Sequence, residues 1–253
     1  MNGLASRGRN SFTTREAQDW LQRSSDATKL SLNRLKKKGL IASPGRGFYV
    51  IVPAEYRSLS CLPADQFIPA LMKHLGLAYY AGLLTAAQYY GAAHQRPQAF
   101  QVFVEKNRRP IKCGSVRVNF IARKAIKDVA TRPFNTPRGT INVSTPEATA
   151  IDLAGYPDHA GGLDQAATVL SELSETLDPE KLADAAQSAP IPWAQRLGYL
   201  LSLGDGAGIT DALQNYVKAH AVKYVALTPN NPMEGERDSR WKLIINERVE
   251  PEF

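Results

Sequence analysis

Residues 11–53, SFTTREAQDWLQRSSDATKLSLNRLKKKGLIASPGRGFYVIVP, contain two helical patterns separated by a short polar break. The first helix is expected to begin at a cap formed by Thr13 or Thr14, which leaves its apolar side chains on one face. Ser24-Ser25-Asp26 supplies a turn and a new N-cap, and a second helix continues to about Lys38. This part of the chain therefore predicts a helix-turn-helix.

A β-hairpin is expected directly after the second helix. Leu40-Ile41 and Phe48–Val52 read as two short strands around the Gly- and Pro-rich tip Ser43–Gly47, which carries Arg46. A helix-turn-helix followed by a hairpin is the plan of a winged helix, whose second helix enters the DNA major groove. We therefore predict a winged-helix DNA-binding domain over residues 1–60.

The net positive charge of the chain is concentrated in these 60 residues. They contain eleven basic and four acidic residues, so their formal charge of +7 equals that of the whole chain. A local cationic excess attracts a polyanion over a Debye length of about 8–10 Å, and nucleic acid is the commonest soluble polyanion in a cell. The charge and the element pattern together favour double-stranded DNA as partner, although winged helices also bind proteins.

The candidate DNA contacts fall into three groups. The outward positions of the second helix are Lys29, Ser31, Asn33, Arg34, Lys36 and Lys37. Arg46 lies at the tip of the hairpin, and Arg7 and Arg9 lie in an amino-terminal arm that can reach phosphates or a minor groove. Lysine and arginine bind phosphates or guanine edges, and Asn33 can pair with adenine, but spacing does not tell which residue reads a base. The alternative for Lys36–Lys38 is a solvated helix end stabilised by the helix dipole.

Residues 64–253 predict a larger α+β domain, strand-rich over 96–145 and helix-rich over 146–220, after a Pro-containing hinge at Ser58–Pro63. The expected helices are Gln66–Leu75, Tyr79–Ala92, Pro146–Leu153, Leu163–Leu177, Pro179–Gln187, Trp193–Leu203 and Thr210–Lys218. The expected strands are Val102–Val104, Val116–Phe120, Ile141–Val143, Lys223–Leu227 and Trp241–Ile245.

A second cationic segment lies within this larger domain. Residues 96–138 contain eleven basic and two acidic residues, whereas residues 139–253 contain eight basic and 17 acidic residues. The candidates for a second basic surface are Arg108, Arg109, Arg123 and Lys124. Such a surface would contact flanking DNA phosphates or an acidic partner. The alternative is that the two oppositely charged segments offset each other within one domain.

The sequence offers little support for catalysis, so we expect no enzyme and no cofactor. Glu147 and Asp152 are five residues apart, which places them on different faces of a helix, and residues 204–208 lack the lysine of a phosphate-binding loop. The histidines, which show no metal-binding spacing, are His74, His94, His159 and His220. No metal site is therefore expected.

The compartment is inferred from the cysteines and from the apolar segments. Cys61 and Cys113 lack metal-binding spacing, and two buried thiols are favoured over one disulfide. No segment has the apolar core of a signal peptide or approaches the roughly 20 apolar residues of a membrane helix. We therefore expect a cytoplasmic protein without membrane contact.

Several segments also resemble one protein family, in order and in spacing. They are FTTREA at 12–17, Leu35 with KGLI at 38–41, RGFYV at 46–50, YYAGLLTAA at 79–87, STPEATAIDL at 144–153 and QRLGYLL at 195–201. Together they resemble the AbiEi antitoxins, the repressor half of bicistronic AbiE-type toxin–antitoxin systems. The resemblance implies an N-terminal domain that binds inverted repeats in its own promoter. It also implies a C-terminal domain that helps repression and neutralises a nucleotidyltransferase-like toxin encoded beside it.

The sequence thus favours a sequence-specific transcriptional repressor and antitoxin that autoregulates its own operon. Two alternatives stay open. A DNA-processing enzyme such as a nuclease would use the winged helix for targeting, and Asp152 would be its candidate catalytic residue. A ligand-responsive repressor would bind a small molecule in its C-terminal domain and leave DNA in response.

Overall fold

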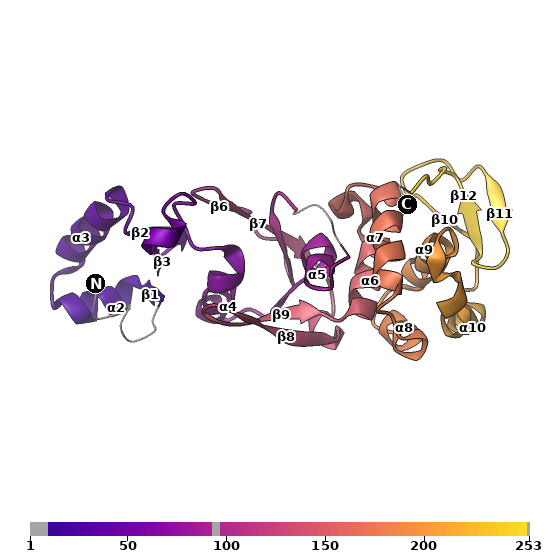
Figure 1. The fold of residues 1–253 in the computed structure, drawn as a ribbon, viewed down its shortest axis with the longest axis horizontal. Helices are drawn as coiled ribbons and strands as arrows, with labels where there is room; N and C mark the ends of the chain where they lie inside the picture. Colours follow the sequence, from indigo (N-terminus) through magenta and orange to yellow (C-terminus); the bar gives the residue numbers. More distant parts are fainter. Residues whose placement is uncertain (1–9, 93–96, 252–253) are drawn as a thin grey trace. The chain divides into compact units, whose positions relative to one another are not determined.

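The structure, a computed structural model, describes residues 10–92 and 97–251 (Figure 1). The chain forms two compact units. Within the described residues, unit 1 comprises the chain up to residue 80 together with residues 98–126 and 133–142, and unit 2 comprises the remainder. In this division residues 61–80, 98–126 and 133–142 group with the amino-terminal module. The expected domains of residues 1–60 and 64–253 stay a prediction.

From residue 10 onward, where its description begins, the amino-terminal module contains two helices and a three-stranded sheet. Its elements are β1 (Ser11–Thr13), α2 (Thr14–Leu21), α3 (Ser25–Lys37), β2 (Ile41–Gly45) and β3 (Phe48–Ile51). The sheet has the order β1-β3-β2, with both pairs antiparallel. This succession of helix, turn, helix and hairpin is compatible with the predicted winged helix.

The ends of both helices follow from local chemistry. The Thr13 hydroxyl accepts a hydrogen bond from the Glu16 amide at 3.2 Å, and the Glu16 carboxylate accepts one from the Thr13 amide at 2.8 Å. This capping box satisfies two amides that a helix start leaves unpaired. The Ser24 hydroxyl caps α3 with a single hydrogen bond, which it accepts from the Ala27 amide, and Gly39 follows the helix with a φ of +66°.

The core of the module is small and largely aromatic or branched. Phe12, Ala17, Leu32 and Ile41 are its buried members, and Phe12 stacks on Tyr49 with 5.5 Å between the ring centroids. Trp20 and Leu21, two further apolar side chains of α2, are 41% and 42% exposed. Both residues belong to the last turn of α2, which ends at Leu21.

The hairpin is longer than the sequence predicted, because β2 continues to Gly45 and only Arg46 and Gly47 form the turn. The Ser43 hydroxyl donates to the carbonyl oxygens of Gly45 and Phe48, at 2.9 and 3.1 Å. These two bonds stabilise the irregular end of the strand, where the pairing register shifts. β1 was not predicted, since its last residue, Thr13, is itself the cap of α2 and no turn separates the strand from the helix.

A six-stranded mixed sheet has the order β6-β7-β5-β4-β9-β8. The elements of this region are η1 (Ala54–Tyr56), α4 (Ala64–Leu75), β4 (Tyr79–Ala81), α5 (Leu83–Tyr89), β5 (Phe100–Val104), β6 (Ile111–Cys113), β7 (Val116–Ala122), η2 (Ile126–Asp128), β8 (Thr131–Thr136) and β9 (Gly139–Ser144). β5 and β7 run parallel, and β6 and β7 run antiparallel.

Cys61 and Cys113 are buried free thiols, and the hydrogen bond between them raises the pKa of Cys61.

One predicted helix of this region was wrong in part. Residues 79–92 were expected to form a single helix, but Tyr79–Ala81 are a strand and the helix begins only at Leu83. Gly82 has an extended backbone at φ −138° and ψ −175°, which separates the two elements. Adjacent aromatic residues favour a strand, and this preference outweighs the helical pattern here.

Unit 2 contains a helical layer and a small three-stranded sheet. Its further elements are α6 (Pro146–Gly155), η3 (Pro157–Ala160), α7 (Leu163–Ser174), α8 (Pro179–Ala186), α9 (Ile191–Ser202), η4 (Asp205–Ile209), α10 (Asp211–His220), β10 (Val225–Ala226), β11 (Glu236–Asp238) and β12 (Leu243–Ile245). α6 packs against α5, α7, α8 and α9 and is buried from Pro146 to Ala154. The mixed α+β class is therefore confirmed. In the portions that the structure describes, no helix has the length and hydropathy needed to cross a bilayer.

Candidate nucleic-acid interface

The exposed face of α3 is the first part of the candidate interface. Leu30, Asn33, Arg34, Lys36 and Lys37 line one hollow of about 580 Å³ and are all exposed. Four of them follow the spacing i, i+3, i+4 and i+7, which places them on one helix face. The opposite face carries the buried Thr28 and Leu32. Leu30 was not predicted as a site residue, although this spacing is visible in the sequence.

Two predicted residues of α3 are engaged within the helix. Ser31 is half-buried, and its hydroxyl donates to the Ala27 carbonyl oxygen at 2.9 Å. Serine in the middle of a helix commonly makes this bond to the preceding turn, so the hydroxyl of Ser31 is engaged within α3. Lys29 is exposed, with its ammonium 3.3 Å from the Asp26 carboxylate, a solvent-exposed pair that contributes little to stability.

Arg46 occupies the turn of the β2–β3 hairpin and is exposed. The next residue, Gly47, has a φ of +72°, a backbone conformation that is unfavourable for residues with a side chain. The carbonyl oxygen of Gly47 accepts a hydrogen bond from the Thr14 amide at 2.9 Å. The turn that carries the arginine is therefore attached to the first residue of α2.

A cationic groove extends from this turn within unit 1. It has a volume of about 470 Å³, and its basic side chains are Arg46, Arg108, Arg109 and Lys112. Its other lining residues are Ser43, Pro44, Gly45, Leu71, Leu75, Pro110, Ile111 and Phe120, so no carboxylate of the described residues lines it. The Arg108 guanidinium lies 5.9 Å from the centre of the Phe120 ring. The lining therefore combines basic side chains that can bind an anionic chain with apolar side chains that can contact its less polar parts.

The second basic surface predicted from the sequence is brought together only in part. Arg108 and Arg109 lie in the cationic groove, and Lys112 of β6 joins them without having been predicted. Arg123 is 3% exposed and donates to the Tyr80 hydroxyl at 2.8 Å, so it is not part of an exposed surface. Lys124 is exposed but does not line the groove.

Some predicted positions fall where the structure gives no placement. Arg7 and Arg9 of the expected arm, together with His94 and Arg96, lie outside the described residues. Across residues 10–92 and 97–251, no cluster of three or more His, Cys, Asp or Glu side chains could hold a metal ion.

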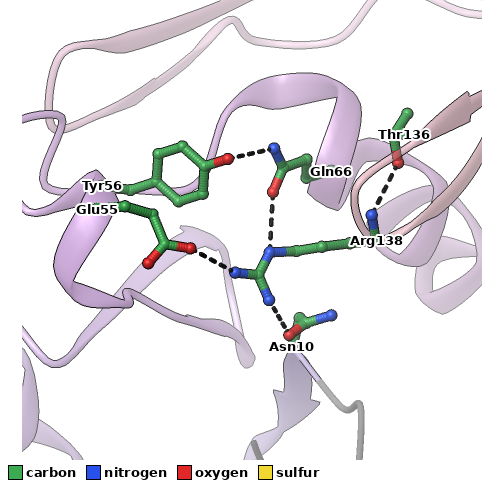
Figure 2. A network of polar contacts seen from close by, with 6 residues as sticks. All are labelled: Asn10, Glu55, Tyr56, Gln66, Thr136 and Arg138. Carbon is green, nitrogen blue, oxygen red and sulfur yellow. Dashed lines mark hydrogen bonds and ion pairs between the residues drawn. The ribbon is translucent and has the colours of Figure 1, made fainter.

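Arg138, at the turn between β8 and β9, is the centre of a polar network that sequence reasoning missed (Figure 2). Its guanidinium donates to Gln66 at 2.9 Å, to Asn10, and to Glu55 at 3.3 Å. Gln66 in turn donates to the Tyr56 hydroxyl at 2.9 Å. The network joins Asn10, the first described residue of the amino-terminal module, to η1, to α4 and to the turn between β8 and β9. Arg138 therefore positions these elements and is not available for a phosphate.

Replacing Arg138 with methionine is expected to lower the free energy of unfolding by about 1–3 kcal/mol. The reason is that Gln66, which is 9% exposed, loses the partner of its side-chain oxygen. Urea unfolding followed by circular dichroism measures the change. Lys124→Met, which removes the same charge from an exposed site, is the control and should stay within about 0.5 kcal/mol of the parent. Equal effects of the two variants would contradict the role given to Arg138.

The buried charged groups of unit 2 serve structure. The Arg196 guanidinium, 3% exposed, donates to the carbonyl oxygens of Ala154 and Leu227, both at 2.7 Å, and burial lowers its pKa. Asp152 is fully buried in α6, and the Glu147 carboxylate accepts from the Asp178 amide at 3.3 Å. A nuclease must bring its carboxylates to a phosphodiester. Asp152 cannot reach one from this position, so the structure does not favour the nuclease alternative.

Comparisons with known proteins add two findings. Residues 80–203 match a family model described as the AbiEi antitoxin C-terminal domain. The chain is also similar to the crystal structure of the RV2827C protein from Mycobacterium tuberculosis, with a TM-score of 0.68 and 18% sequence identity over 96% of this chain and 88% of that one. At this identity the likeness concerns the fold alone. No curated protein matches the chain.

Proposed function

Because residues 80–203 place the chain in the AbiEi antitoxin family, we propose that it is the antitoxin and transcriptional repressor of a bicistronic toxin–antitoxin operon. In this proposal it binds inverted repeats of double-stranded DNA in its own promoter, with α3 in the major groove and the β2–β3 hairpin on the backbone. It also counteracts a nucleotidyltransferase-like toxin encoded beside it. The role is cytoplasmic and requires no catalysis.

The observation that carries the DNA-binding part is the arrangement of cations in unit 1. Arg34, Lys36 and Lys37 lie on the exposed side of α3, and four further cations line a groove without a carboxylate that begins at the hairpin turn. Phosphate contacts from lysine and arginine supply much of the affinity of DNA-binding proteins and fix their orientation on the duplex. Asn33 among the cations of α3 adds a group that can pair with adenine.

The direct test is binding of the full chain to the DNA upstream of its own gene and to a random duplex of equal length. We expect tighter binding to the upstream DNA, by on the order of 1,000-fold, and an affinity that falls steeply as salt is raised. Measurements at two salt concentrations give both quantities. An affinity that neither depends on salt nor distinguishes the two duplexes would contradict the proposal.

The antitoxin part is tested separately in cells. If the gene directly downstream encodes a nucleotidyltransferase-like protein, its expression alone should arrest growth, and co-expression of this chain should restore growth. A variant with alanine at Arg34, Lys36 and Lys37 should still restore growth when both genes are expressed from foreign promoters, because repression is then not needed. Growth arrest that this chain does not relieve would contradict the antitoxin role without affecting the DNA-binding part.

Single substitutions on α3 should separate the two kinds of DNA contact. Lys36→Ala is expected to weaken binding to all duplexes and to make the salt slope shallower by about 0.9, the value of one phosphate contact. Asn33→Ala is expected to relax the base preference at one position of the operator, at a cost of about 1–3 kcal/mol there. Competition binding with a set of single-base operator variants measures both effects. The same loss for both substitutions on operator and random DNA would contradict the role of Asn33.

A further inference from the structure

The exposed face of α3 contains one apolar side chain among its polar and cationic residues. Leu30 is 59% exposed and lies in the same hollow as Asn33, Arg34, Lys36 and Lys37. It follows the fully buried Thr28 by two residues, which is a rotation of roughly 200° about the helix axis. Leu30 therefore points almost directly away from the core of the amino-terminal module.

Nothing within the described fold requires a leucine at this position. The buried members of the module's core are Phe12, Ala17, Leu32 and Ile41, and Leu30 is not among them or among the partly buried residues packed against them. An exposed leucine buries apolar surface only when a partner covers it, and the gain grows with the area removed from water. The chemistry of its neighbours on α3 identifies the kind of partner.

The surrounding charges favour DNA as the molecule that covers Leu30. Arg34 and Lys37 follow it by four and seven residues on the same helix face, and Lys36 lines the same hollow. A polyanion would therefore be attracted to the surface that presents the leucine. On the major-groove edges of DNA, the C5-methyl group of thymine is the apolar feature that a side chain can contact.

We propose that Leu30 is a specificity-determining residue that contacts the C5-methyl group of a thymine in the operator. This inference rests on the proposed function, since it requires α3 to enter the major groove. Asn33 lies one helix turn further along the same face, so it would contact the base edges of an adjacent step. The preference at that step would then combine a methyl contact with an amide hydrogen bond.

The test exploits deoxyuridine, which differs from thymidine only by the missing methyl group. Each thymine of the bound upstream DNA is replaced in turn, and the affinity of the full parent chain is compared with that of Leu30→Ala. We expect one or two positions in each half-site at which the parent chain loses about fourfold in affinity, the factor for one buried methyl-sized group. At these positions Leu30→Ala should bind the thymine and uracil duplexes equally well.

Leu21→Ala is the matched control, because Leu21 is also exposed, at 42%, but belongs to α2. It should keep the full sensitivity of the parent chain to deoxyuridine. Circular dichroism should show that both variants are as folded as the parent. Loss of sensitivity in both variants would overturn the assignment to Leu30.

The remaining outcomes separate this inference from the proposed function. If the parent chain binds the upstream DNA specifically but no thymine responds to uracil, or the response persists in Leu30→Ala, the inference alone is wrong. If the parent chain shows no preference for the upstream DNA, the inference and the DNA-binding proposal both fail. If Leu30→Ala instead lowers the mass of the free protein in sedimentation, a second copy of the chain covers Leu30 and the inference is overturned.

Discussion

Gly198→Ala is expected to lower the free energy of unfolding by about 3 kcal/mol or more, the upper part of the range for overpacking a core. A methyl group at this position of α9 would lie 2.1–2.4 Å from three ring atoms of Trp241. That ring is fully buried, and its indole N–H donates to the Ser202 hydroxyl at 3.2 Å, so it has little room to move. Helix propensity alone would make the alanine variant more stable by about 1 kcal/mol. A loss of stability would therefore show that the contact with Trp241 outweighs helix propensity.

Gly208→Ala is the control for this prediction. It adds the same methyl group in η4, where nothing lies within 4 Å of the new atom. We expect its effect to stay within about 0.5 kcal/mol. Urea unfolding, followed by tryptophan fluorescence and by circular dichroism, measures both variants. A Gly198→Ala protein as stable as the parent would show that the helix and the indole can separate at low cost.

The triple variant Arg46→Ala, Arg108→Ala, Arg109→Ala is expected to weaken binding to the upstream DNA by on the order of 100-fold. These three arginines line the cationic groove, so their loss removes three candidate phosphate contacts at once. The slope of log affinity against log salt should become shallower by about 2.7, since each contact contributes about 0.9. Base preference should persist, because α3 is unchanged. Fluorescence anisotropy over a salt series gives the affinity and the slope together.

The control removes three positive charges from exposed positions of unit 2, with alanine at Lys218, Lys223 and Arg248. Both variants have the same net charge, so a general loss of attraction would affect them equally. We expect the control to keep nearly the full salt slope of the parent chain. Equal slopes for the two triple variants would show that the groove does not follow the DNA backbone.

The sequence predicted the elements whose boundaries depend on neighbouring residues. Thr13 and Ser24 cap their helices through amides only three residues away. A short window of sequence therefore contains both residues of each capping bond. The apolar helices α6 and α9 were also predicted, because the helical spacing of their apolar residues lies within one short segment. The strand β4 was missed because its pairing partner, β9, lies some 60 residues later in the chain, and no local pattern contains that information.

The candidate site was predicted less completely than the fold. Arg123 was expected at the surface, but its partner Tyr80 lies 43 residues earlier and draws the guanidinium into the interior. Arg138 was not singled out, since its partner Asn10 is 128 residues away. The position of Leu30 on the outward face of α3, in contrast, follows from helical spacing alone. It was not predicted as a site residue because leucine is usually a core residue.

The hydrogen bond from the Thr14 amide to the Gly47 carbonyl oxygen has a consequence for the thermodynamics of association. It holds the arginine-bearing turn in one conformation before any partner arrives. A free loop would lose conformational entropy on binding, at about 1–2 kcal/mol for each residue whose backbone becomes fixed. Here the backbone part of that loss has already occurred during folding, so complex formation has a smaller entropic penalty to overcome.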